Sequence, residues 1–128
     1  MTELTWKNIK HFVPKEFDSP DLPGISGQKM NLPFVVALDA IRDIVGVPLK
    51  VNSGYRSKAH NKAVGGVSNS AHTQGLAADI RCTSDELRAR IVRAAIKSGI
   101  TRIGLGATMI HLDMDDTLPA PRIWLYPS

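Results

Sequence analysis

The sequence predicts an α+β fold in which a small antiparallel sheet carries helices on one face. Two segments repeat apolar residues at helical spacing, and two others alternate apolar and polar residues as half-buried strands do. The chain has 128 residues, which is the size of one domain with its own apolar core. We therefore expect residues 1–128 to form a single domain with a layer of helices and a layer of strands.

The first predicted elements are a long loop and a helix. Residues 14–33 contain four prolines and two glycines, which predicts a loop of the kind that carries function or packs over a groove. Asn31 is the expected N-cap of the following helix, and Pro33 fits its first turn, where no amide hydrogen is needed. The apolar repeat continues to Gly46, where this helix should end.

The middle of the chain predicts two strands and two helices. A short strand is expected at 49–52 and a brief helix at 58–64. Residues 76–82 alternate as a strand does, which places Asp79 on the face away from the core. The capping box Thr83-Ser84-Asp85-Glu86 then begins a second long helix, which should end at Gly99.

Three further strands complete the expected sheet, at 102–105, at 109–114 and, as an edge strand, at 122–126. Alternation in 109–114 turns His111 and Asp113 away from the core. If this strand and that of Asp79 pair in one sheet, the three side chains can converge on its open face.

Composition excludes several classes of protein. The net charge of +4 comes from basic residues that are scattered along the chain, and aromatic residues are few, so we expect no nucleic-acid partner. The positive charge is compatible with binding to a polyanion such as a bacterial wall, and equally with an ordinary solvated surface. No apolar run reaches about 18 residues, which predicts no membrane insertion. The N-terminus lacks the plan of a secretory signal, so synthesis in the cytoplasm is expected. Cys82 is the single cysteine, which excludes an intrachain disulfide and a cysteine zinc cluster. We expect a monomer.

His72, Asp79 and His111 are the candidate metal ligands. Two imidazoles and one carboxylate are the kind of set that holds a catalytic zinc and leaves a fourth position for water. Residues of these types also occur simply as hydrogen-bonded side chains, and from the pattern alone both interpretations stay open. His11 and His60 are expected to be surface or hydrogen-bonded residues.

Three motifs carry a resemblance to a known family. They are Ser53-Gly54-Tyr55-Arg56-Ser57, the element Ser-x-His-x-x-Gly-x-Ala-x-Asp over residues 70–79, and Ile110-His111-Leu112-Asp113. Together they resemble the D-alanyl-D-alanine carboxypeptidase-like zinc peptidases, of the superfamily that includes phage L-alanoyl-D-glutamate endolysins and the Hedgehog signalling domain. The resemblance covers about residues 10–115.

This resemblance implies both a function and a site. His72, Asp79 and His111 would hold one Zn²⁺ per chain, and Arg56 would hold the oxyanion or a substrate carboxylate. Ser53, Tyr55 and Ser70 would lie near the substrate or the metal. The implied activity is hydrolysis of peptidoglycan stem peptides, either as a D-Ala-D-Ala carboxypeptidase or as an L-Ala-D-Glu type endopeptidase. The implied setting is the bacterial cell wall, with a phage-encoded lytic or virion enzyme as one source.

One position departs from the family pattern. Many members carry an acid three residues before the last histidine as general base, and this chain has Thr108 there. Asp113 could replace that base, or it could orient His111 as a hydrogen-bond partner. A non-catalytic zinc-binding module for wall binding or virion assembly is therefore the alternative function.

Overall fold

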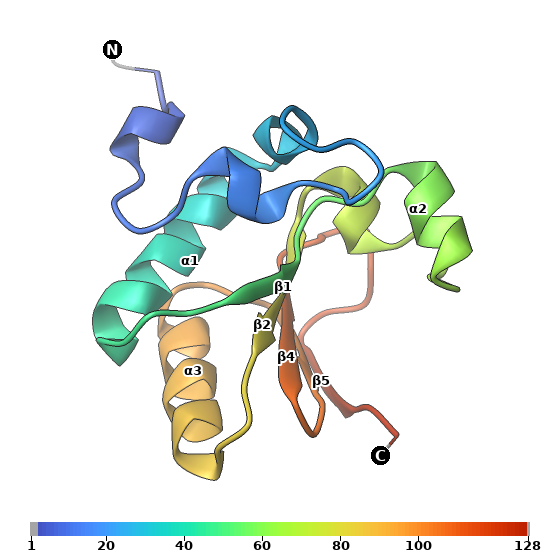
Figure 1. Cartoon of the computed structure of the whole chain (residues 1–128). Helices are drawn as coiled ribbons and strands as arrows, with labels where there is room; N and C mark the ends of the chain where they lie inside the picture. Colours follow the sequence, from blue (N-terminus) through green and yellow to red (C-terminus); the bar gives the residue numbers. More distant parts are fainter. Residues whose placement is uncertain (1–2, 128) are drawn as a thin grey trace.

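A five-stranded sheet with the order β1-β2-β4-β3-β5 forms the centre of the structure, a computed structural model that describes residues 3–127 (Figure 1). The strands are β1 (Val51–Ser53), β2 (Ala77–Arg81), β3 (Arg102–Leu105), β4 (Met109–Asp113) and β5 (Arg122–Leu125). Every neighbouring pair is antiparallel except β3 and β5, which run parallel. The α+β class is confirmed, and the sheet is mostly antiparallel rather than wholly so.

The parallel pairing of β3 and β5 follows from the path of the connection between β4 and β5. Arg102 at the start of β3 lies opposite Asp113 at the end of β4. Residues 114–121 lead the chain from this end of the sheet to Arg122, which pairs with Arg102. Since β5 starts at the same end as β3, the two strands must point the same way.

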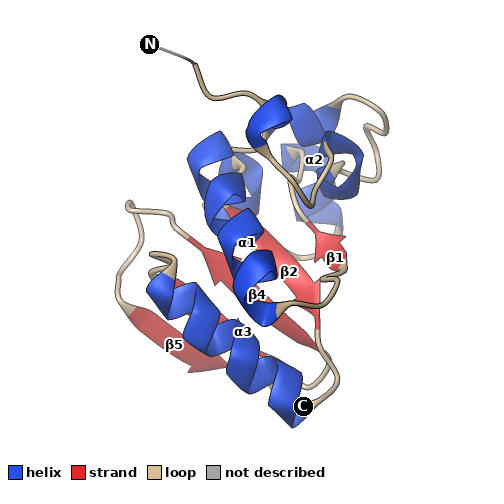
Figure 2. Ribbon diagram, turned by 90° about the vertical axis from the view of Figure 1, so that its left-hand side faces the viewer, coloured by secondary structure: helices blue, strands red, loops and turns tan. Residues whose placement is uncertain are grey.

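Helices α1 (Leu32–Val45) and α3 (Asp85–Lys97) pack against each other over one face of the sheet (Figure 2). Asn31 caps α1 by accepting a hydrogen bond from the Phe34 N–H, and Gly46 ends it with a φ of +79°. Ser84 caps α3 in the same way. The expected boundaries of α1 are confirmed, whereas α3 has Ser84 rather than Thr83 of the predicted capping box as its N-cap and ends at Lys97, before Gly99. Their apolar faces and the inner face of the sheet form one core, whose largest fully buried side chains include Phe34, Leu38, Ile80, Ile91 and Ile110.

The loop predicted over residues 14–33 contains two short 3₁₀ turns, η2 (Pro14–Phe17) and η3 (Ser26–Lys29). Hydrogen bonds tie this segment to the chain after β1: the Tyr55 N–H donates to the Phe17 carbonyl, and the Ser57 N–H donates to Ser19 Oγ. The N-terminal segment therefore fixes the backbone on both sides of Arg56.

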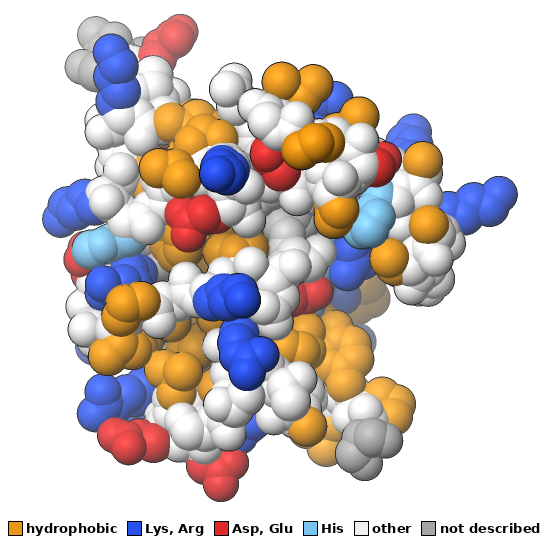
Figure 3. Space-filling view, in the orientation of Figure 1, with side chains coloured by type: hydrophobic (Ala, Val, Ile, Leu, Met, Phe, Trp, Pro, Cys, Tyr) orange, Lys and Arg blue, Asp and Glu red, His pale blue; other side chains and the backbone are white. Residues whose placement is uncertain are grey.

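The smaller helix α2 (Lys58–Ala63) is capped by Ser57, as expected, and lies away from α1 and α3 (Figure 1). The turn η4 (Ala71–Gln74) follows it and leads into β2. None of the helices in the described part of the chain is long and apolar enough to cross a membrane. On the face seen in Figure 3, basic side chains are spread among acidic and apolar ones.

Pairing of β2 with β4 confirms the predicted faces. Ile80 pairs with Ile110 and both are fully buried. Asp79 pairs with His111 in the same register. Because side chains alternate along a strand, Asp79 and His111 lie together on the face opposite α1 and α3.

Candidate metal centre

His72 is held in one orientation by the backbone around it. Ser70 caps η4 by accepting a hydrogen bond from the His72 N–H, and His72 itself is 2% exposed. Its Nδ1 lies 2.7 Å from the Gly54 carbonyl oxygen, which can only accept, so Nδ1 carries the proton. The other ring nitrogen, Nε2, is the one left to face a metal ion, and it lies 3.4 Å from Asp79 Oδ2.

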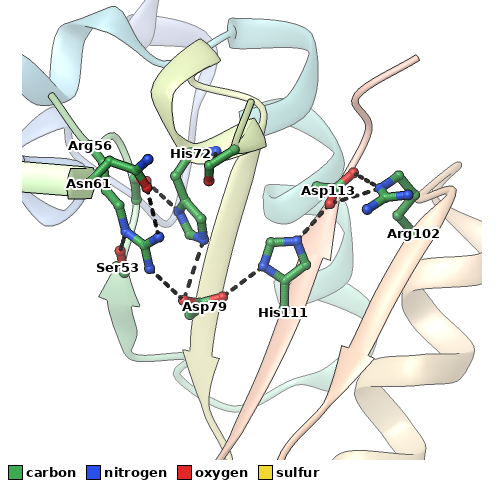
Figure 4. Close-up of polar contacts among 10 residues, drawn as sticks. Ser53, Arg56, Asn61, His72, Asp79, Arg102, His111 and Asp113 are labelled. Carbon is green, nitrogen blue, oxygen red and sulfur yellow. Dashed lines mark hydrogen bonds and ion pairs between the residues drawn. The ribbon is translucent and has the colours of Figure 1, made fainter. Parts of the chain in front are cut away.

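Asp79 lies between the two imidazoles. Its Oδ1 is 2.9 Å from His111 Nδ1, and its Oδ2 faces His72 (Figure 4). Burial alone would raise the pKa of Asp79, but hydrogen bonds from both histidines outweigh burial and hold this pKa well below its usual range. Asp79 is thus an anion placed to face a cation.

His111 has a carboxylate at each ring nitrogen. Asp113 Oδ2 lies 2.6 Å from Nε2, on the side of the ring away from Asp79. Burial alone would lower the pKa of His111, yet the carboxylates of Asp113 and Asp79 raise it above its ordinary value. Without a metal, both ring nitrogens can therefore hold protons.

Asp113 is 1% exposed and its two oxygens are fully engaged. Besides His111, it faces Arg102, whose Nε lies 3.0 Å from Oδ1, and it accepts a hydrogen bond from the Asp115 N–H. A carboxylate that binds the outer nitrogen of a histidine is the usual support of a metal ligand. The contact with Nε2 of His111 is the one that the orienting role of Asp113 requires, and Asp113 also lines the cavity described below.

The donor set fits a zinc ion. One ligand atom each from His72, Asp79 and His111 lies within 4.8 Å of the others. Two imidazoles and a carboxylate are suitable zinc ligands, and three protein ligands leave a position for water or substrate. Each imidazole is also oriented through its second nitrogen, by Gly54 for His72 and by Asp113 for His111.

Arg56 lies beside the centre and is fixed on three sides. Its Nη2 is 3.5 Å from Asp79 Oδ2, its Nε donates to Ser53 Oγ, and its Nη1 donates to Asn61 Oδ1 (Figure 4). Asn61 is buried, and its amide nitrogen donates to the Val67 carbonyl. Ser53 therefore contacts Arg56 directly, and Asn61, to which the sequence analysis gave no role, binds the same guanidinium.

A cavity of about 370 Å³ opens over these groups, and Arg56, Ser70, His72, Asp79, His111 and Asp113 line it. Among residues 3–127, Asp79 and Asp113 are the carboxylates that line this metal-site cavity. Tyr55 is not among its lining residues: the ring packs against the core, with the Lys29 ammonium 5.6 Å from its centroid. Thr108 is exposed on the turn before β4 and also lies outside the cavity lining.

Sequence reasoning also missed three other residues of this site. Arg102 reaches Asp113 from the neighbouring strand, and Trp124 and Tyr126 line the cavity from the C-terminal segment. The alternation of residues 122–126 is a signal that puts the two aromatic side chains on one face of a strand, but only the pairing of β5 shows which face of the sheet this is. Burial raises the pKa of the Tyr126 hydroxyl, which keeps it protonated and able to donate.

The other histidines lie away from the centre. His11 Nε2 lies 2.6 Å from Asp43 Oδ1, which confirms that His11 is a hydrogen-bonded residue. His60 belongs to α2, and its N–H donates to the Ser57 hydroxyl that caps this helix.

The chain is similar to known proteins over the region that contains His72, Asp79 and His111. Residues 10–113 match the family described as peptidase M15. A zinc D-Ala-D-Ala carboxypeptidase from Streptomyces albus G is 43% identical over 67 residues, which make up 52% of this chain and 26% of that relative. The matched part is thus about a quarter of the relative's length. Since the family match spans most of the chain, this protein belongs to the peptidase M15 family.

Proposed function

We propose that this chain is a zinc peptidase that hydrolyses peptide bonds in peptidoglycan stem peptides at the bacterial cell wall. The observation that carries the proposal is the convergence of His72 Nε2, Asp79 and His111 Nδ1, with the second nitrogen of each imidazole held by the protein. The name of the relative, a zinc D-Ala-D-Ala carboxypeptidase, supports the metal and the class of substrate.

His72, Asp79 and His111 would hold one zinc ion per chain. Zinc bound there would polarise the scissile carbonyl and lower the pKa of a water molecule. Asp113 keeps the proton of His111 on Nε2, so that Nδ1 presents its lone pair to the ion.

Arg56 is the residue that would bind the negative charge of the substrate. Its guanidinium lines the metal-site cavity and is held by Ser53 and Asn61, so it need not reorganise when an anion arrives. Either a terminal carboxylate or the oxyanion that develops at the scissile carbonyl would suit it. Binding of a terminal carboxylate is expected of a carboxypeptidase. Stabilisation of the oxyanion is expected of a carboxypeptidase and of an endopeptidase alike.

The test is digestion of intact peptidoglycan and of a purified muropeptide pentapeptide by the zinc-loaded protein, with products read by mass spectrometry. We expect either loss of the terminal D-alanine or a split at the L-Ala-D-Glu bond, and the mass of the product names the bond. The chelated protein and a His72→Ala variant should give neither product.

A second candidate function is a non-catalytic zinc-binding module for wall binding or virion assembly. The observation that favours it is that both carboxylates lining the cavity in residues 3–127 are already engaged by histidines. A protein that carries one zinc per chain, binds peptidoglycan and releases no product would establish this candidate instead.

A further inference from the structure

The C-terminal segment supplies a wall of the metal-site cavity although it lies beyond the family match. That match ends at residue 113. Leu118, Trp124 and Tyr126 nevertheless line the cavity together with the metal ligands. The family region therefore accounts for the metal ligands, while this wall comes from residues that follow it.

The wall is fixed to the sheet at several points. β5 pairs with β3 from Arg122 to Leu125, and the Tyr126 N–H donates to the Leu105 carbonyl. Arg102 donates from Nη1 to the Pro119 carbonyl at 2.6 Å, and its guanidinium lies 5.0 Å from the Trp124 ring centroid. Arg102, which binds Asp113, therefore also binds the segment that forms the wall.

Gly104 makes space for the two rings. It pairs with His111 on one side and with Trp124 on the other. A Cβ at Gly104 would lie 2.6 Å from Tyr126 Cε2 and 2.8 Å from Trp124 Cε2, closer than carbon atoms can approach. With no side chain there, the Trp124 ring lies 5.4 Å from that of His111, and the Tyr126 ring follows at 6.0 Å from Trp124.

The side chains on the two faces of β5 differ in how far they are buried. Ile123 and Leu125 point to the opposite face and are 57% and 78% exposed, whereas Tyr126 is 38% exposed and Trp124 is half-buried. A strand that merely covered the core would bury its aliphatic side chains. Here the better packed side chains are the aromatic ones beside the metal ligands.

We propose that Trp124 and Tyr126 are substrate-contacting residues that pack against the side chain next to the cleaved bond and determine which side chain is accepted there. The inference rests on the proposed peptidase function and adds the residues that set its selectivity. Both rings line the metal-site cavity, and the Trp124 ring lies 5.4 Å from that of His111, so a peptide bound at the metal ligands would contact them.

Two stem peptides that differ only in whether alanine or leucine flanks the cleaved bond test this selectivity. We expect the unchanged protein to show a preference between the two peptides in kcat/KM, and Trp124→Ala and Tyr126→Ala to reduce that preference by about tenfold or more. Ile123→Ala, on the same strand but the other face, should keep the preference. An unchanged preference in both aromatic variants, with zinc still bound, would overturn the proposal.

Fluorescence gives a readout that does not need turnover. A Trp6→Phe variant leaves Trp124 as the single tryptophan, and the dipeptides D-alanyl-D-alanine and L-alanyl-D-glutamate serve as probes. We expect a saturable change in Trp124 emission with at least one of them in the zinc-loaded protein. If that change occurs while no stem peptide is cleaved, the result contradicts the peptidase function but supports the contact between Trp124 and the peptide. Cleavage by the unchanged protein with no fluorescence change from either probe would overturn the contact alone.

Discussion

At the scale of single residues, the two nitrogens of His111 have separate partners. Nδ1 faces Asp79 and the prospective ion, while Nε2 faces the buried Asp113. Sequence alternation could place His111 and Asp113 on one face, because side chains two apart on a strand share a face. It could not show that Asp113 lies behind the imidazole, because that depends on the Arg102 side chain from another strand.

Asp113→Asn separates the two roles of this residue. An asparagine can still accept from Nε2 of His111 but carries no charge and cannot take up a proton. If Asp113 orients the ligand, zinc affinity and turnover should both fall by about 10- to 100-fold. Isothermal titration with zinc and single-turnover assays measure the two quantities. Abolished turnover with unchanged zinc affinity would instead identify Asp113 as the general base.

Arg56→Ala should keep the zinc and lose activity. The guanidinium contacts Asp79 at 3.5 Å but is not a ligand, so elemental analysis should show full metal content. Loss of a charged donor at the reacting group should lower kcat/KM by about 10²- to 10³-fold. An unchanged kcat/KM would show that Arg56 has only a structural role.

At the scale of elements, η4 carries His72 and Gly75 ends that turn. Gly75 has a φ of +70°, and a Cβ there would lie 2.5 Å from the Lys29 carbonyl oxygen. The close approach at Gly75 is thus to the segment that precedes α1. The Asn31 N–H, which donates to the Gly75 carbonyl, holds that segment in place.

Gly75→Ala should therefore destabilise the protein and loosen His72. The left-handed conformation alone costs about 1 to 3 kcal/mol for a residue with a side chain, and the backbone collision adds to it. Gly46→Ala is the matched control, since Gly46 has a φ of +79° and open space around its Cβ. Denaturant unfolding should show a larger loss for Gly75→Ala, with weaker zinc binding in that variant only. Equal losses would contradict a tight contact at Gly75.

The elements that sequence predicted best are those with local patterns. Capping residues and apolar repeats located α1 and α3, and alternation located β2 and β4. The parallel pairing of β5 and the 3₁₀ turns before α1 were not predicted, because they depend on contacts between distant segments. The cavity wall of Trp124 and Tyr126 was missed for the same reason.

At the scale of the whole molecule, zinc binding should be coupled to folding and to pH. In the metal-free protein the pKa of His111 is raised, so its protonated form stabilises the folded state. That contribution is fully present below the ordinary histidine pKa of 6.5 and is lost as the pH rises through the higher folded value. Zinc requires the unprotonated ring, so its affinity should fall as the pH falls.

The increase in Tm on adding zinc should consequently be small near about pH 5 and larger near about pH 8. Differential scanning calorimetry with and without zinc measures this increase at each pH. A His111→Ala variant should lose most of the pH dependence. An increase of the same size at both pH values would show that His111 is not a ligand.

Diffraction from crystals of the zinc-loaded protein at the zinc absorption edge tests the central claim most directly. The account predicts one anomalous peak per chain, bonded to His72 Nε2, Asp79 and His111 Nδ1, with Asp113 still on Nε2 of His111. A peak bonded elsewhere, a His111 that binds through Nε2, or a zinc-loaded protein without a peak at this centre would contradict it.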